Sequence, residues 1–249
     1  AVTLDTETFT AKILDNVIDD NKAGRQAFAV AISVEDASPS AGITIQGNTI
    51  SNYDIGLRVE DEAASLTVSG NSFGDSGDTQ VVNEDATNTV NASGNWWGSY
   101  VESTVSAGMT GLVDFTPYLH SGTDTDGAAA GFQGDLSHLH VTAAGNQTGG
   151  SGRIQEGVTA IADGGTINIA DGTYTAAVVI DSKGMTLTGA SQAGVIVQAT
   201  TTADALVNGP SSSNVFSVGY NDAAGTAGKA IQIQQMTIQN GAYGIRSKA

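Results

Sequence analysis

Residues with side chains capable of chemistry are sparse in this 249-residue chain. Arg58 and Glu60 stand two apart in the stretch GLRVED, so on a strand they would share one face and form the best local cation–carboxylate pair. Asp124 and Asp126, in DTDG, match half of a calcium loop. A full loop needs more acidic ligands at fixed spacing and a distal Glu. A plain polar turn is therefore the favoured interpretation, and calcium is the candidate cofactor.

The remaining reactive groups also lack companions. His138 and His140 are two apart and would hold a metal only if a third ligand came from elsewhere, so polar packing is favoured. Glu60, Asp61 and Glu62 form an acidic run that is typical of a solvated loop. The chain has no cysteine, which excludes disulfides, thiol catalysis and cysteine-ligated zinc. No catalytic set follows from these residues.

The chain that must position these residues is acidic and has few charged residues. Lys and Arg total 9 against 26 Asp and Glu, for a net charge of −17. Nucleic acids and anionic membrane surfaces need dense positive charge, so neither is expected as a partner. No apolar run approaches the roughly 18 residues that a membrane span requires. The composition favours an extracellular or cell-surface protein without membrane insertion.

A repeat runs along the first half of the chain. Segments with two apolar residues two apart, followed by Asn, occur at 11–19, 43–51, 66–74 and 89–98. Their recurring asparagines are Asn16, Asn48, Asn71 and Asn95. The last two intervals, 23 and 24 residues, approximate one coil of a β-helix, and the first carries an insertion near 35–41. Because Asn tolerates left-handed backbone angles and bonds to its own chain, a structural turn ladder is predicted.

The repeat predicts an all-β fold, a right-handed parallel β-helix. Strands this short bury an apolar face by stacking on the same strand of the next coil, about 4.8 Å away. The far end matches the beginning, because residues 231–245 align without gaps on residues 43–57. Helical spacing at 154–162 predicts one short helix.

Two motifs resemble a known family. The stretch from Arg153 to Gly189, with GGTINIADGTY at its centre, is similar to the opening of pectin-lyase-like right-handed β-helix proteins, in which a short helix caps the first coil. GNWWGS at 94–99, followed by GLVDFTPYL, resembles the Asn-Trp-Trp-Gly closing coil of bacterial and archaeal surface proteins. The resemblance implies that Trp96 and Trp97 pack in a closing coil. Adjacent strand residues point to opposite faces, so at most one of them would face a sugar-binding groove.

The two motifs stand in reversed order. The sequence therefore predicts closing-type coils at 1–119, a bridge at 120–152, and a capping helix with opening-type coils at 153–249. Joined tail to head, the two ends read as successive coils of one helix. Two explanations remain open: one repeat of a tandem array, or separate subunits that stack head to tail.

These features predict a structural extracellular module that is not an enzyme. Its expected partner is itself, stacked head to tail into a filament or surface layer. An adhesin that binds glycans is the first alternative. A polysaccharide lyase or epimerase, which the family resemblance implies, is the second. Arg58 would then be the base, beside calcium-binding acids.

Overall fold

The protein is a parallel β-helix in a computed structural model that describes residues 2–5, 10–20, 29–35, 42–61, 66–75, 79–199, 214–219 and 229–247. This confirms the all-β prediction. The chain divides into two compact units. The first unit comprises Ala1–Asp135 and Ala144–Thr148, and the second comprises Leu136–Ala143 and Gly149–Ala249. The 120–152 stretch, read as a bridge in the sequence, is thus shared between the units.

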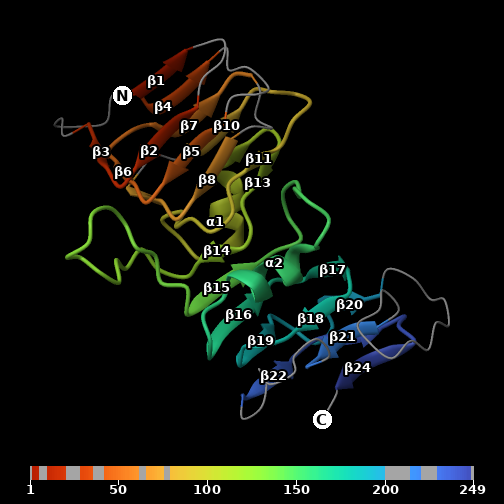
Figure 1. Cartoon of the computed structure of the whole chain (residues 1–249). Helices are drawn as coiled ribbons and strands as arrows, with labels where there is room; N and C mark the ends of the chain where they lie inside the picture. The colour runs from red at the N-terminus through yellow and green to blue at the C-terminus, as the bar shows by residue number, and fades with distance from the viewer. Residues whose placement is uncertain are drawn as a thin grey trace. The chain divides into compact units, whose positions relative to one another are not determined.

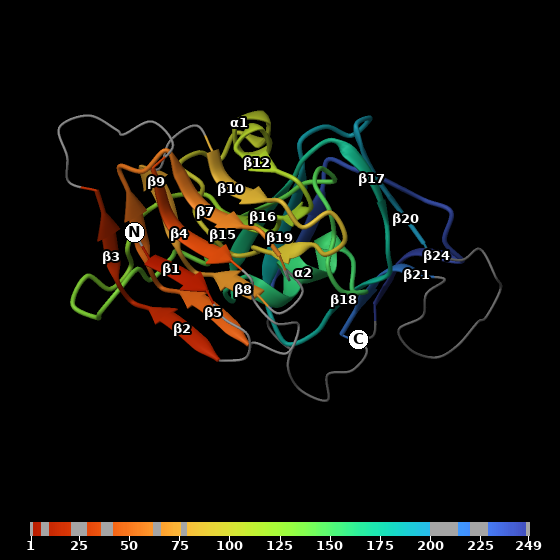
Figure 2. The ribbon, with the colours of Figure 1, turned by 90° about the horizontal axis from the view of Figure 1, so that it is seen from above.

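The first unit stacks its coils in three parallel sheets. Sheet A has the order β1 (Val2–Asp5), β4 (Val30–Glu35), β7 (Ile55–Val59), β10 (Thr79–Asn83) and β12 (Met109–Thr110). Sheet B has the order β2 (Ala11–Leu14), β5 (Ile43–Gln46), β8 (Leu66–Ser69), β11 (Val90–Asn91) and β13 (Val113–Asp114). Sheet C contains β3 (Val17–Asp19), β6 (Thr49–Ser51) and β9 (Ser72–Asp75). Figure 2 shows β1, β4, β7 and β10 lying side by side.

Alternation along each strand builds the core of the first unit. In β5 and β8 the first and third residues are buried and the others face outward, as period-2 patterns require. The parallel register places Ile45 on Val68 and on Ile13, so each apolar side chain covers the one in the next coil. The predicted insertion near 35–41 falls largely outside the described residues.

One end of the first unit is closed. There α1 (Glu102–Ala107) precedes β12, and β14 (Tyr118–Leu119) follows β13. Phe115 and Tyr118 are buried in the same region. Backbone bonds from Asn146 to Val113 and from Phe132 to Gly47 anchor later residues of this unit to its coils.

The second unit repeats the three-sheet plan. Within this unit, the strands of sheet B′ are β15 (His138–Val141), β16 (Gly165–Ile169), β19 (Met185–Gly189) and β22 (Ile231–Gln234). Sheet C′ runs β17 (Gly172–Thr175), β20 (Val195–Gln198) and β23 (Thr237–Gln239). Sheet A′ runs β18 (Val178–Ile180), β21 (Asn214–Val218) and β24 (Tyr243–Ser247). The three sheets can be followed from green to blue in Figure 1.

The predicted helix caps the start of the second unit. It is α2 (Arg153–Ala160), and Ile154, Val158 and Ile161 are buried as their spacing predicts. Its last carbonyls are satisfied because Lys183 Nζ donates to Thr159 and Ile161, each at 2.7 Å. A cation at this end also suits the helix dipole. No helix among the described residues is long and apolar enough to cross a bilayer.

Candidate functional site

The four repeated asparagines form a continuous ladder in the first unit. Each Asn donates from its backbone N and its Nδ2 to the Oδ1 of the next, over 2.8–3.0 Å, in the order Asn16, Asn48, Asn71, Asn95. Asn48, Asn71 and Asn95 are fully buried, whereas Asn16 is exposed at the end of the row. The ladder therefore satisfies the turn of every coil without water, as a structural element should.

The left-handed backbone lies one residue before each ladder asparagine, which refines the sequence argument. The residues with positive φ are Asp15 (57°), Gly47 (68°), Gly70 (64°) and Gly94 (79°). Glycine adopts such angles at no steric cost. The asparagines contribute their amides to the ladder, while the preceding residue makes the turn.

Trp96 and Trp97 lie in the closing region of the first unit and differ in burial. Trp97 is 1% exposed, its ring stacks on Phe73 with centroids 4.8 Å apart, and its Nε1 donates to the carbonyl of Phe115 at 3.3 Å. Trp96 is half-buried with its indole close to Gly74 and Gly122. Only Trp96 keeps surface that a sugar could stack on.

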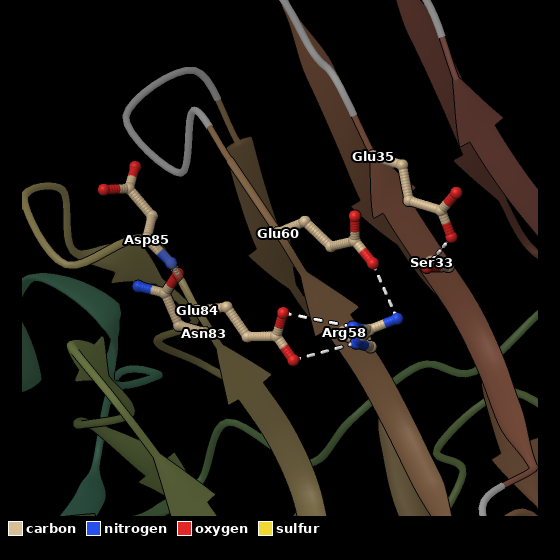
Figure 3. A network of polar contacts seen from close by, with 7 residues as sticks. All are labelled: Ser33, Glu35, Arg58, Glu60, Asn83, Glu84 and Asp85. Atoms are coloured by element: carbon tan, nitrogen blue, oxygen red, sulfur yellow. Dashed lines mark hydrogen bonds and ion pairs between the residues drawn. The ribbon is translucent and has the colours of Figure 1, made fainter.

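Arg58 lies on the outer face of sheet A between two carboxylates (Figure 3). Its Nε and Nη2 donate to the two oxygens of Glu84 at 3.0 and 3.1 Å, and its Nη1 lies 2.6 Å from Glu60. The hydrogen bonds to Glu84 raise the pKa of Arg58 above its ordinary value. The arrangement is an ion pair on the sheet surface, bidentate to Glu84 and extended by Glu60. A base must be neutral to take a proton, and a lyase role for Arg58 stays a prediction.

The acidic run is part of a longer column on this face. In-register pairing continues from Val34–Val59 and Val59–Asn83, so Glu35, Glu60 and Glu84 follow one another at the ends of β4, β7 and β10. Ser33 Oγ donates to Glu35 at 2.6 Å. Asp61 follows the column in sequence, and Glu62 lies outside the described residues. The sequence did not identify Glu84, because it lies one coil away from Arg58.

Asp85 closes a buried turn next to this column. Its carboxylate accepts bonds from the backbone and hydroxyl of Thr87 at 2.8 and 2.7 Å, and from the backbone and side chain of Asn88 at 3.0 and 2.8 Å. Desolvation alone would raise the pKa of Asp85, but these bonds outweigh it and lower the pKa well below its ordinary value.

This carboxylate should make the first unit acid-sensitive. Because the folded pKa is depressed, its stabilisation is present above the unfolded value of about 3.9 and is lost as pH falls below that. We expect Asp85→Asn to cost about 2 kcal/mol of unfolding free energy at pH 7. The cost should shrink at the lowest pH where the unit still folds. Urea unfolding at several pH values measures it, and a cost that is constant with pH would contradict the assignment.

Asp124 and Asp126 lie in an exposed loop of the first unit. Asp124 Oδ1 accepts from the backbone of Asp126 at 3.1 Å and of Gln133 at 3.3 Å, while Asp126 Oδ1 accepts from Ala128 at 3.2 Å. These are turn bonds of the kind that Asp forms with its own chain. Calcium binding by this pair stays a prediction.

The histidines of β15 share one face, as their spacing predicts. The rings of His138 and His140 stack with centroids 5.6 Å apart, and His138 Nε2 lies 2.6 Å from Asn168 Nδ2 on β16. Leu139 and Val141 alternate with them and are buried. Within the second unit this is polar packing along the strand, and metal binding by the pair remains untested.

Each unit has one open end, built from strands with a free edge. In the first unit β1, β2 and β3 end their sheets, and in the second β22, β23 and β24 do so, within the described residues. The first three are the N-terminal strands of their stack and the last three are C-terminal. The two open ends therefore have opposite polarity along the solenoid.

The seven strands at one open end have the same arrangement as the seven at the other. The sequence alignment revealed this equivalence only for the last coil. Strands β18–β24 and β1–β7 run through the sheets in the same order. Their register agrees: Phe216 lies between Val178 and Ile245, just as Ile32 lies between Val2 and Leu57. The two open ends therefore have the same three-sided cross-section.

Among the described residues, no further coil covers the inward-facing apolar side chains of β22, β23 and β24. Ile231, Ile233 and Ile238 are partly exposed, although their counterparts in the first unit, Ile43, Ile45 and Ile50, are at most 2% exposed. Ile245 is 52% exposed, whereas Leu57, its counterpart in β7, is fully buried.

Comparisons of the chain with protein-family models, with curated proteins and with solved structures gave no match.

Proposed function

We propose that this protein is a structural, extracellular β-helix module whose copies join head to tail into a filament or surface layer. The observation that carries the proposal is the pair of open ends with opposite polarity and a common cross-section. The open end of the second unit in one copy meets the open end of the first unit in the next. The parallel sheets then continue from copy to copy.

The physical drive comes from two sources. Exposed strand edges present rows of N–H and C=O groups that pair readily with another chain. Burial of apolar side chains adds about 25 cal/mol for each Å² removed from water. Ile245, Ile231 and Ile233 supply such surface at the open end of the second unit. An end-to-end contact covers both kinds of surface at once.

The other ends of the units carry additional elements within the part of the chain that the structure describes. Helix α2 covers the first coil of the second unit, and the aromatic residues Phe115 and Tyr118 are buried at the closed end of the first. Association should therefore be linear, with one joint for each copy. A heterologous contact of this kind gives open filaments unless its rotation closes a ring.

Ile245→Asp tests the proposal. A carboxylate at this inward position would be buried in the joint without a partner, so we expect filaments seen by electron microscopy to be lost and sedimentation to show single chains. Val101→Asp is the matched control, because Val101 is 47% exposed and belongs to the start of α1 and not to a terminal strand of either open end. It should assemble like the unchanged protein.

The opposite results would overturn the proposal. The unchanged protein, concentrated to millimolar levels and still monodisperse, would exclude self-assembly of the chain. Equal assembly by the Ile245 and Val101 variants would exclude this end as the joint.

A further inference from the structure

The last strand of one open end and the first strand of the other belong to the same side of the solenoid. Among the described strands, β24 is the last of sheet A′ and β1 is the first of sheet A. Successive strands of one sheet in a β-helix are separated along the chain by one strand of each other sheet. Strands β24 and β1 therefore compete for one position.

Resting on the proposed head-to-tail assembly, we infer that β24 of one copy replaces β1 on the edge of β4 in the next copy. If β24 paired with β1 instead, one strand position would stay empty between β22 and β2. A second empty position would lie between β23 and β3. With β1 displaced, β24 pairs with β4, β22 with β2 and β23 with β3. Only this arrangement closes all three sheets at a spacing of about 4.8 Å.

The side chains of β24 fit the vacated edge. Val2 pairs with Ile32 in the first unit, and Ile245 holds the same place beside Phe216 in the second. Replacement thus sets the larger, half-exposed Ile245 on Ile32 in place of Val2. Strand β24 has five residues against four in β1, so the exchanged strand offers a longer pairing edge.

Charge also favours the exchange. Arg246 of β24 pairs with Ser217 in the second unit, and Ser33 of β4 pairs with Arg58 in the first. In the exchanged joint, Arg246 would therefore lie opposite Ser33. It would approach Ser33 from the side away from Arg58. Ser33 bonds to Glu35, the column carboxylate nearest that edge. Arg246 of the preceding copy would therefore meet the carboxylate column at the place where the neutral Thr3 now lies. Such complementarity selects the partner and the register more than it adds affinity.

Disulfide trapping can tell exchange from simple addition, because the chain has no cysteine of its own. Ser33 and Arg246 become neighbours between copies only if β24 sits on β4. Thr3 and Arg246 become neighbours only if β24 sits on β1. We expect oxidised Ser33→Cys/Arg246→Cys protein to give a ladder of linked copies on a non-reducing gel, and Thr3→Cys/Arg246→Cys protein to give none.

A disulfide lock, which ties β1 to β4 and leaves Arg246 unchanged, provides the second measurement. Thr3 pairs with Ser33, so Thr3→Cys/Ser33→Cys should tie β1 to β4 within one chain. Oxidation should then abolish filaments, and reductant should restore them.

The outcomes separate the two proposals. Filaments that cross-link through Thr3 and Arg246, or an oxidised lock that still assembles, would overturn strand exchange while head-to-tail assembly stands. Absence of filaments from the unchanged protein would overturn both.

Discussion

Replacing Asn71 with alanine should lower the unfolding free energy of the first unit by about 3–5 kcal/mol. The Oδ1 of Asn71 accepts from the backbone and side chain of Asn48, and its Nδ2 donates to the carbonyls of Ile45 and Ser69 and to Asn95. Alanine leaves several of these groups buried without partners, at about 1–3 kcal/mol each. Urea unfolding followed by tryptophan fluorescence reports on this unit, because both tryptophans lie in it.

Asn16 provides the matched control for this substitution. It donates in the row as Asn71 does, but it is exposed, and no other described asparagine donates to its Oδ1. Water can solvate the groups that Asn16→Ala leaves, so we expect a loss below about 1 kcal/mol. Similar losses at both positions would show that the amide row does not stabilise the coils beyond ordinary surface turns.

Trp97→Ala should destabilise the first unit by about 3–5 kcal/mol. The side chain is buried, stacks on Phe73 and donates to the Phe115 carbonyl. Its removal opens a cavity in the closing region and orphans that carbonyl. The fluorescence of Trp96 remains as the reporter of unfolding.

The neighbouring tryptophan gives the comparison. Trp96 is only half-buried, so Trp96→Ala should cost about 1–2 kcal/mol. If Trp96→Ala proved the more damaging change, the closing coil would be stabilised by the outer indole, and the burial argument would be wrong.

The sequence predicted the coil pattern because burial in a β-helix depends on local alternation. Ile43, Ile45, Leu66 and Val68 are inward as their spacing indicates. The asparagine row was also predictable, since its members recur near one coil length. The helix α1 was not predicted, and its six residues carry too short a pattern for helical periodicity to be detected.

Contacts between coils were the part that sequence could not supply. Local spacing predicted that Arg58 pairs with Glu60, but its bidentate partner is Glu84. Arg58 and Glu84 are 26 residues apart in the sequence. They come into contact only because the loop lengths fix the register of neighbouring coils. The equivalence of β1 and β18 was hidden for a similar reason. Their short stretches, VTLD and VVID, match too few letters to be recognised before the pairing with β4 and β21 is known.

The asparagine row also sets where an assembled fibre would be mechanically weakest. In the last coil of the second unit, Gln235 has the left-handed angle of Gly47 (φ 56° against 68°), and the ladder position after it is Met236. A thioether cannot donate to Asn16 of the next copy. Under the proposed assembly, each joint lacks the side-chain Nδ2 bond of the rung, and only the backbone N–H of Met236 can donate to Asn16. Tension should therefore part copies at their joints before it unwinds that stack, so a fibre would break into whole subunits that can join again.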